Sequence, residues 1–132
     1  MELHENHRKI LKLCADDETG LWLVIKRICG EEYYWSIVPD SLRQEVMNTI
    51  HDLLSYGFIE AGNFEKEEAG KYKWMPLLLS ADKIIKFIEH EWNSLGKTPN
   101  IGDICWFIAT EKGKNLQKNS SIKTFTFKWI TL

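Results

Sequence analysis

The sequence predicts a single α+β domain over residues 1–132, in which amphipathic helices pack on a small antiparallel sheet. Two long segments, 41–56 and 81–95, carry apolar residues at helical spacing. The length of the chain is sufficient for one hydrophobic core. Short segments that are continuously apolar or alternate in polarity are typical of strands, and they lie at 58–61, 71–75 and 104–109.

The N-terminal part of the chain predicts two further helices. Residues 2–14 mix apolar and charged side chains with moderate amphipathicity. Residues 21–29 are apolar nearly all round and are followed by a glycine, so we expect a central helix preceded by three acidic residues. Because Val24 and Ile25 are β-branched, a strand remains the alternative for this segment.

The third predicted helix begins near Asp40 or Ser41, in a sequence that fits a capping box. Its apolar residues at helical spacing predict one buried face, and Gly57 predicts its end. A strand at 58–61 follows, then a charged loop over 63–70. The strand at 71–75 would complete a hairpin.

The C-terminal half predicts a strong helix followed by short elements. Ser80 is placed to cap the helix at 81–95, and Gly96 is placed to end it. After the strand at 104–109, Thr110 is placed to cap a last helical turn over 111–117. A loop at 119–121 then leads to Phe125, Phe127 and Trp129, which alternate with polar residues and predict a strand with one apolar face.

Composition and charge limit the classes of function. The formal net charge is −2, so the whole chain has no general attraction for a phosphate backbone. We expect a cytoplasmic protein, since no apolar run could span a bilayer and the first residues lack the pattern of a signal peptide. Cys14, Cys29 and Cys105 are too few and too widely spaced for a disulfide framework or a zinc motif, and we expect buried thiols.

No catalytic motif is present, and we expect neither catalytic residues nor a metal or other cofactor. His4 and His7 are three residues apart and could share a helix face as metal ligands. No further ligand stands at a matching spacing, so we expect a solvated terminus instead. His90 lies between Glu89 and Glu91, a pattern typical of the solvent-facing side of a helix.

Two segments carry a resemblance to a known family. The end of the third predicted helix with its following strand, 53–62, resembles the end of a winged-helix recognition helix and its first wing strand. Residues 107–116 resemble the strand and helix start that close such a wing. Here about forty residues, including the helix at 81–95, separate the two pieces. The stretch 91–107 is similar to a motif of small bacterial proteins. The resemblance implies a winged helix-turn-helix scaffold, a fold best known for binding DNA.

A winged-helix transcriptional regulator is therefore one hypothesis for the function. It would read bases with the third helix and touch phosphates with wing lysines. The charge of 40–62 argues against it, because four acidic residues there face one basic residue. The hypothesis assigns base contacts to Arg43, Gln44, Asn48 and Thr49, and phosphate contacts to Lys66, Lys71 and Lys73.

The favoured hypothesis is a non-enzymatic protein-binding module. Its most concrete form is a bacterial immunity protein that binds and neutralises a cognate toxin, such as a nuclease. Small size, the lack of a catalytic motif and acidic clusters beside aromatic residues all favour it. The predicted contact residues are Asp16, Asp17, Glu18, Glu31, Glu32, Tyr33, Tyr34, Trp35, Phe64, Glu65, Glu67 and Glu68.

Overall fold

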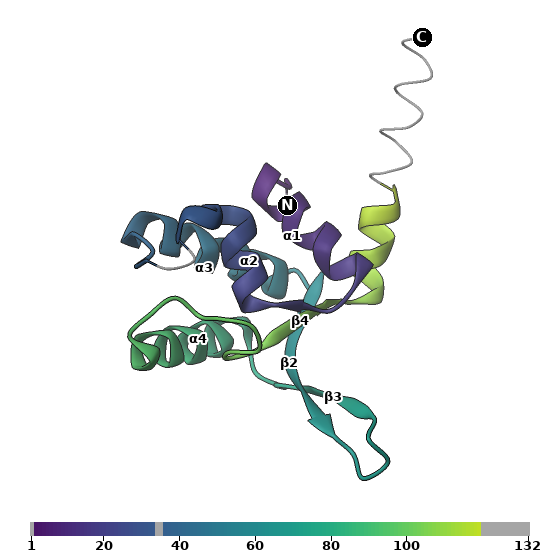
Figure 1. The fold of residues 1–132 in the computed structure, drawn as a ribbon. Helices are drawn as coiled ribbons and strands as arrows, with labels where there is room; N and C mark the ends of the chain where they lie inside the picture. Colours follow the sequence, from purple (N-terminus) through teal and green to yellow (C-terminus); the bar gives the residue numbers. More distant parts are fainter. Residues whose placement is uncertain (1, 34–35, 120–132) are drawn as a thin grey trace, which may run out of the picture.

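The computed structural model describes residues 2–33 and 36–119, and within them the chain forms an α+β fold (Figure 1). Its elements follow one another along the chain as α1 (Glu5–Asp16), β1 (Thr19–Gly20), α2 (Leu21–Cys29), the short 3₁₀ helix η1 (Glu31–Tyr33), α3 (Asp40–Ser55), β2 (Ile59–Lys66), β3 (Tyr72–Pro76), α4 (Ala81–Leu95) and β4 (Trp106–Ala109). Residues 111–119 are also helical.

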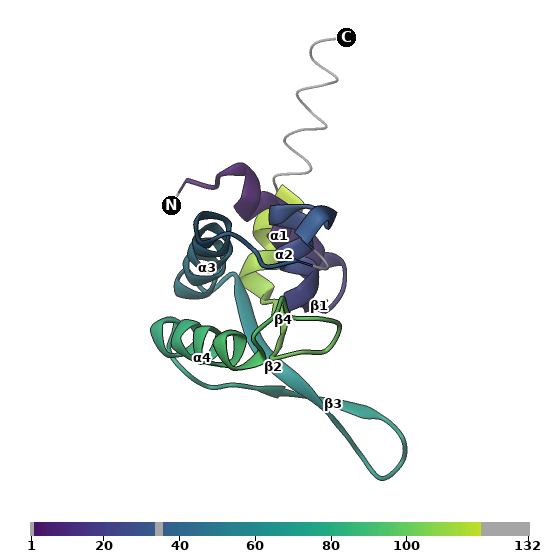
Figure 2. The ribbon, with the colours of Figure 1, turned by 60° about the vertical axis from the view of Figure 1, so that its left-hand side comes forward.

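The four strands form one antiparallel sheet in the order β1-β4-β2-β3. The central strand β4 pairs with both neighbours, because Phe107 lies opposite Thr19 of β1 and Ala61 of β2. β2 and β3 form a hairpin that extends beyond the rest of the sheet (Figures 1 and 2). The predicted strands at 58–61 and 71–75 both occur within this hairpin, but their predicted pairing is wrong, because β3 pairs with residues 62–66 and residues 59–62 pair with β4.

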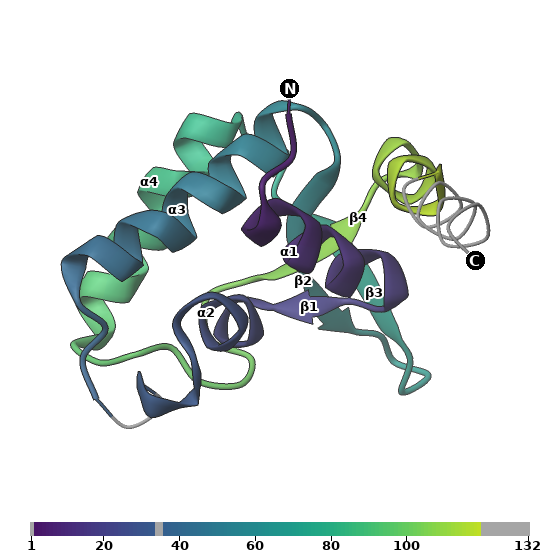
Figure 3. The same cartoon turned by 90° about the horizontal axis from the view of Figure 1, so that it is seen from above.

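One face of the sheet forms the floor of the core. Alternate residues of β2 and β4, namely Ile59, Ala61, Phe107 and Ala109, are all buried. Seen from above, α1 lies across this part of the sheet, with α2 and α3 beside it (Figure 3). The helices contribute buried apolar residues on one stripe each, as expected for amphipathic helices packed on a sheet.

α4 runs alongside α3 rather than over the sheet (Figures 2 and 3). The Arg43 guanidinium of α3 lies 4.5 Å from the centre of the Trp92 ring and donates a hydrogen bond to the Glu89 carbonyl at 3.3 Å. As predicted, the Ser80 hydroxyl caps α4 by accepting from the Lys83 amide, and Gly96 ends it in a left-handed conformation with φ 65°.

The segment 21–29 is a helix, so its strand alternative is wrong. α2 ends at Gly30, whose φ of 95° suits glycine. The three acidic residues before it do not reach its first turn, because the two residues of β1 intervene and pair with β4. No local pattern predicts β1, because its two residues form a strand only through their pairing with β4.

Two predicted boundaries are wrong. α3 begins directly after Pro39, which takes the N-cap position with an extended conformation, and no side chain caps the helix. Asp40 and Ser41 are therefore inside the first turn, and the predicted capping box does not form. β2 extends to Lys66, which lies inside the predicted loop at 63–70, because residues 62–66 all pair with β3.

The end of the described chain agrees with its prediction in the helix start, but the helix continues through residue 119, where the predicted loop begins. The Thr110 hydroxyl accepts a hydrogen bond from the Gly113 amide at 3.1 Å and so caps the helix at 111–119. The predicted loop at 119–121 reaches beyond the described residues, and the strand predicted at 125–129 lies wholly outside them. None of the helices in the described part of the chain combines the length and the apolar character needed to cross a bilayer.

Candidate protein-interaction surface

The outer face of the sheet, opposite the core, is covered by aromatic rings. Trp106 of β4 points to this face, and Phe64 and Trp74 of the hairpin point there with it. Two glycines make room for the rings. A Cβ on Gly62 would lie 2.7 Å from the Trp74 ring, and a Cβ on Gly20 would lie 2.7 Å from the ring of Trp22. The backbone at Gly62 and Gly20 thus forms the surface on which the indole rings of Trp74 and Trp22 lie.

These rings hold the base of the hairpin in a fixed shape. Phe64 meets Trp74 edge-to-face at 5.1 Å between ring centres, and it meets Trp106 in the same way at 5.9 Å. The Trp74 indole N–H donates to the Glu60 carboxylate at 2.7 Å. All three rings are half-buried. The hairpin therefore projects from the body on a rigid aromatic base (Figure 2).

The outer strand of the hairpin and the linker after it expose large apolar side chains. Seven such side chains are exposed in the described residues, and four of them fall between positions 72 and 79. Leu78 is 89% exposed and has φ 44°, a left-handed conformation that leucine rarely adopts. We call these four side chains, which are close along the chain although Tyr72 and Met75 point to opposite faces of β3, the β3–α4 patch, and they are Tyr72, Met75, Leu78 and Leu79.

The acidic clusters predicted as a contact surface lie in three separate places (Figures 1 and 3). The first, 16–18, precedes β1 at the end of the sheet away from the hairpin. The second, 31–33, follows the far end of α2, and the third, 64–68, lies on the hairpin. Tyr34 and Trp35 lie outside the described residues. Only the hairpin group, which includes Phe64, adjoins the β3–α4 patch.

The residues predicted to read DNA are not presented together. Thr49 is buried, and its hydroxyl donates to the Glu45 carbonyl one turn earlier at 2.8 Å, so its predicted outward position is wrong. Arg43 is engaged with α4 as described above. Gln44 and Asn48 remain exposed and bond to each other at 2.8 Å. The wing lysines are exposed, as Lys66, Lys71 and Lys73 all lie on the hairpin.

His7 contradicts the prediction of a solvated terminus. It is only 6% exposed, and its Nε2 lies 2.9 Å from the Asp52 carboxylate of α3. Its Nδ1 accepts a hydrogen bond from the His4 amide at 3.0 Å. A neutral ring must therefore carry its proton on Nε2 and donate it to Asp52. This pair ties α1 to α3 and has a structural role.

A second histidine–carboxylate pair is exposed and does not form a hydrolytic triad. The Nε2 of His51 lies 2.7 Å from Asp82 and 3.5 Å from the Ser55 hydroxyl. A triad needs the carboxylate on one ring nitrogen and the nucleophile on the other. Here Ser55 and Asp82 share one nitrogen, and the Asp52 carboxylate lies 4.0 Å from the other, beyond hydrogen-bond distance, so no carboxylate orients the ring for proton transfer from Ser55.

The cysteines and carboxylates form neither a reactive thiol nor a metal site among the described residues. Burial raises the pKa of Cys14 and of Cys105 to about 12, and that of Cys29 to about 11. The prediction of buried free thiols is confirmed. Residues 2–33 and 36–119 contain no cluster of three or more histidine, cysteine or acidic side chains that could hold a metal ion.

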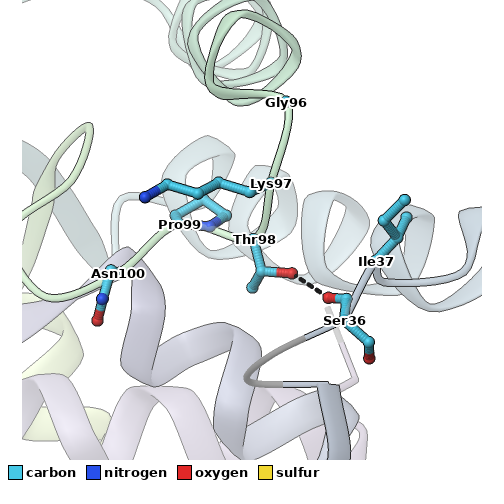
Figure 4. A pocket seen from close by; sticks show the side chains of 7 residues that line it. All are labelled: Ser36, Ile37, Gly96, Lys97, Thr98, Pro99 and Asn100. Atoms are coloured by element: carbon cyan, nitrogen blue, oxygen red, sulfur yellow. Dashed lines mark hydrogen bonds between the residues drawn. The ribbon is translucent and has the colours of Figure 1, made fainter.

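A surface pocket of about 200 Å³ lies between residues 36–37 and the loop 96–100 after α4 (Figure 4). The Thr98 hydroxyl closes one side by donating to the Ser36 carbonyl at 2.7 Å. Lys97 is the only charged residue among the described ones that line it. The lining includes no carboxylate, histidine or cysteine, so these residues provide no acid–base pair.

The β3–α4 patch was missed in the sequence because a run of leucines suggests a core. Its flanks carried the signal, since Pro76 ends the strand and Ser80 begins a helix, which leaves 77–79 in a connection. No protein-family model matches the chain, and no curated protein or solved structure is significantly similar to it. The function must therefore be argued from the surface itself.

Proposed function

We propose that this chain is a non-enzymatic, cytoplasmic protein-binding module whose contact surface is the β3–α4 patch. The observation that carries the proposal is the concentration of exposed apolar side chains on the eight residues 72–79. Exposed apolar side chains that cluster, rather than scatter singly, mark interaction sites. The aromatic base of the hairpin limits the loss of conformational freedom on binding, which supports tight recognition.

The charge of the hairpin favours a protein partner over nucleic acid. Between Ile59 and Pro76 there are four glutamates and three lysines, which gives 3 − 4 = −1. Phosphate recognition needs an excess of positive charge on the contacting surface. With Thr49 buried and Arg43 held by α4, the DNA-binding alternative also lacks half of its base-reading set.

The concrete form that we propose is a bacterial immunity protein that neutralises a toxin, such as a nuclease. Glu65, Glu67 and Glu68 lie on the hairpin beside the β3–α4 patch, an arrangement suited to steering a basic partner onto an apolar contact. The chain order helix, strand, helix, helix, strand, with β4 between β1 and β2, supports a winged-helix scaffold. In that scaffold β3 and α4 are an insertion between the wing strands, and the insertion carries the patch.

The test uses isothermal titration to measure binding to any toxin domain that is encoded next to the gene for this chain. The double substitution Tyr72→Ser and Leu78→Ser should weaken binding about 30-fold, which corresponds to about 2 kcal/mol at an interface hot spot. Ile101→Ser is the matched control, because Ile101 is 63% exposed but lies in the turn before β4. The control should bind like the unchanged protein.

Two results would count against the proposal. One is equal affinity of the double variant and the control, which would separate binding from the β3–α4 patch. The other is a salt-sensitive gel shift with the DNA upstream of the gene that is lost in Gln44→Ala and Asn48→Ala. That result would favour the alternative hypothesis, a DNA-binding transcriptional regulator.

A further inference from the structure

The outer edge of β3 carries backbone groups that no neighbouring strand pairs. β3 stands last in the strand order and pairs with β2 alone. At its two ends the Leu77 amide donates to the Ala61 carbonyl at 3.0 Å, and the Lys71 carbonyl accepts from the Glu67 amide at 2.7 Å. Both contacts are made by odd-numbered residues that directly flank β3.

These end contacts fix which backbone groups face outward. Bonded and non-bonded positions alternate along an antiparallel pair. Lys73 and Met75 share the parity of the bonded ends and turn their N–H and C=O groups toward β2. Tyr72 and Trp74 therefore direct theirs to the free edge. Pro76, the next outward position, has no N–H and ends the run of donors.

We propose that this edge binds an extended segment of the partner protein as an added strand, with acidic residues opposite Lys71 and Lys73. The inference rests on the proposed function and specifies how the partner is recognised. An added strand would satisfy the outward groups of Tyr72 and Trp74 and would lie directly beside the β3–α4 patch.

Charge complementarity indicates whether the incoming strand should carry acidic or basic side chains. Lys71 and Lys73 are exposed, and neither forms an ion pair within the described part of the chain. Glu65 lies opposite Lys73 in the register of β2, yet their charged groups are not within ion-pair distance. A strand added on the other side would place its own residue about 5 Å from Lys73, between Cβ atoms. An acidic residue at that place gains an attraction, whereas a basic one is repelled.

The same edge disfavours a second copy of this chain. If two β3 strands paired antiparallel with Tyr72 opposite Trp74, every outward group would be bonded, but Lys73 would face Lys73 of the second copy. If Trp74 faced Trp74 of the second copy, Tyr72 would face Pro76, which lacks a donor. Edge lysines and prolines are common protections against such self-pairing. The fitting occupant is therefore an acidic segment of the partner protein, a local feature of a partner that the hairpin glutamates attract by its overall basic charge.

The test uses the full ¹⁵N-labelled chain and a short synthetic peptide that alternates valine with glutamate. With peptide added, hydrogen exchange should slow at the amides of Tyr72 and Trp74 and stay unchanged at Lys73 and Met75, which already bond to β2. A peptide with lysine in place of glutamate should bind about tenfold more weakly. The substitution Lys73→Glu should abolish this preference, because the introduced carboxylate offsets the charge of Lys71, and because Lys73 is exposed the fold should stay intact.

Several outcomes would overturn the strand-pairing proposal. They are protection spread evenly over residues 72–75, protection absent at saturating peptide, or equal affinity for the two peptides. The proposed function is tested separately by the toxin titration. If toxin binding is lost in the Tyr72→Ser and Leu78→Ser variant but unchanged in Lys73→Glu, the β3–α4 patch is correct and the added strand is wrong.

Discussion

Leu78 combines two unfavourable properties in one residue. Its side chain is almost fully exposed, and its φ of 44° places Cβ close to the following carbonyl group. That conformation costs a residue other than glycine about 1 kcal/mol or more. Neither property stabilises the isolated chain. The two together support a contact made in the complex, where the leucine would be buried.

We expect Leu78→Gly to raise the free energy of unfolding by a few tenths to about 1 kcal/mol, because the relief of the clash at positive φ exceeds the added freedom of the unfolded chain. Leu79 is similar in type and also exposed, but its φ is not positive. Leu79→Gly should therefore lower stability by a few tenths to 1 kcal/mol through added freedom in the unfolded chain. Urea denaturation of both variants measures the difference, and two variants that shift stability in the same direction would contradict the strain at Leu78.

At the scale of elements, the helix at 111–119 is fixed to the start of β2 by a very close approach. The Thr110 amide donates to the Phe58 carbonyl at 3.0 Å, and the Thr110 hydroxyl donates to the Gly57 carbonyl at 2.6 Å. Gly113 lies over the same backbone, where a Cβ would be 2.0 Å from the Phe58 oxygen. At position 113, only glycine leaves enough room between this helix and the backbone of Phe58.

The prediction from this contact is that Gly113→Ala destabilises the protein by about 2 kcal/mol or more, because helix and strand must separate. The sign is opposite to that expected from helix propensity, where alanine is favoured over glycine by about 1 kcal/mol. Lys114→Ala is the control, since Lys114 is exposed one residue further along the same helix. It should change stability by less than about 0.5 kcal/mol. Thermal unfolding that shows a more stable Gly113→Ala variant would disprove the close contact.

Elements with local signals could be predicted, and elements made by distant contacts could not. α4 carries its cap, its apolar stripe and its terminal glycine within one stretch of sequence. The partner of His7, in contrast, is Asp52, which lies 45 positions away. Nothing near His7 indicates that its ring is buried. β1 was missed for the same reason, because its two residues are a strand only through β4.

The candidate site shows the same division. The sequence identified the hairpin and the aromatic and acidic character of its residues, since these are properties of the chain itself. Whether the three acidic clusters meet on one surface depends on how α2 and the sheet are arranged, and they do not meet. Exposure of Leu78 and Leu79 depends on the path of the linker between β3 and α4, which no periodicity indicates.

For the whole molecule, the buried thiols report on the integrity of the core. Because burial raises the pKa of Cys14 and Cys105 to about 12, the native thiols stay protonated and enclosed at pH values near 8. We expect a disulfide exchange reagent to label none of the three cysteines quickly in the native protein, and all three in concentrated guanidinium chloride. Rapid labelling of the native chain would contradict the packing of the core.

The raised pKa values of Cys14 and Cys105 contribute to a loss of stability at alkaline pH. In the unfolded chain a thiol ionises near 9.0, whereas the native thiols of Cys14 and Cys105 hold their protons to about 12. The unfolded state therefore loses protons first, and the free energy of unfolding should fall as pH rises from about 9 toward 12. Below pH 9 these thiols should contribute no slope. Cys14→Ala should show a shallower alkaline decline than the unchanged protein, and an identical decline would contradict this assignment.

The position of β4 in the sheet has a consequence for synthesis on the ribosome. It is an interior strand, yet among the described strands it is the last to be made, and its residue Phe107 must reach Thr19, which is made 107 − 19 = 88 residues earlier. The hairpin β2–β3 can close as soon as it emerges, but it cannot join β1 until β4 arrives. Contacts so distant along the chain form slowly. Until then the edge of β2 that faces β4 remains unpaired, and the nascent chain has to be kept from edge-to-edge aggregation until β4 has been made.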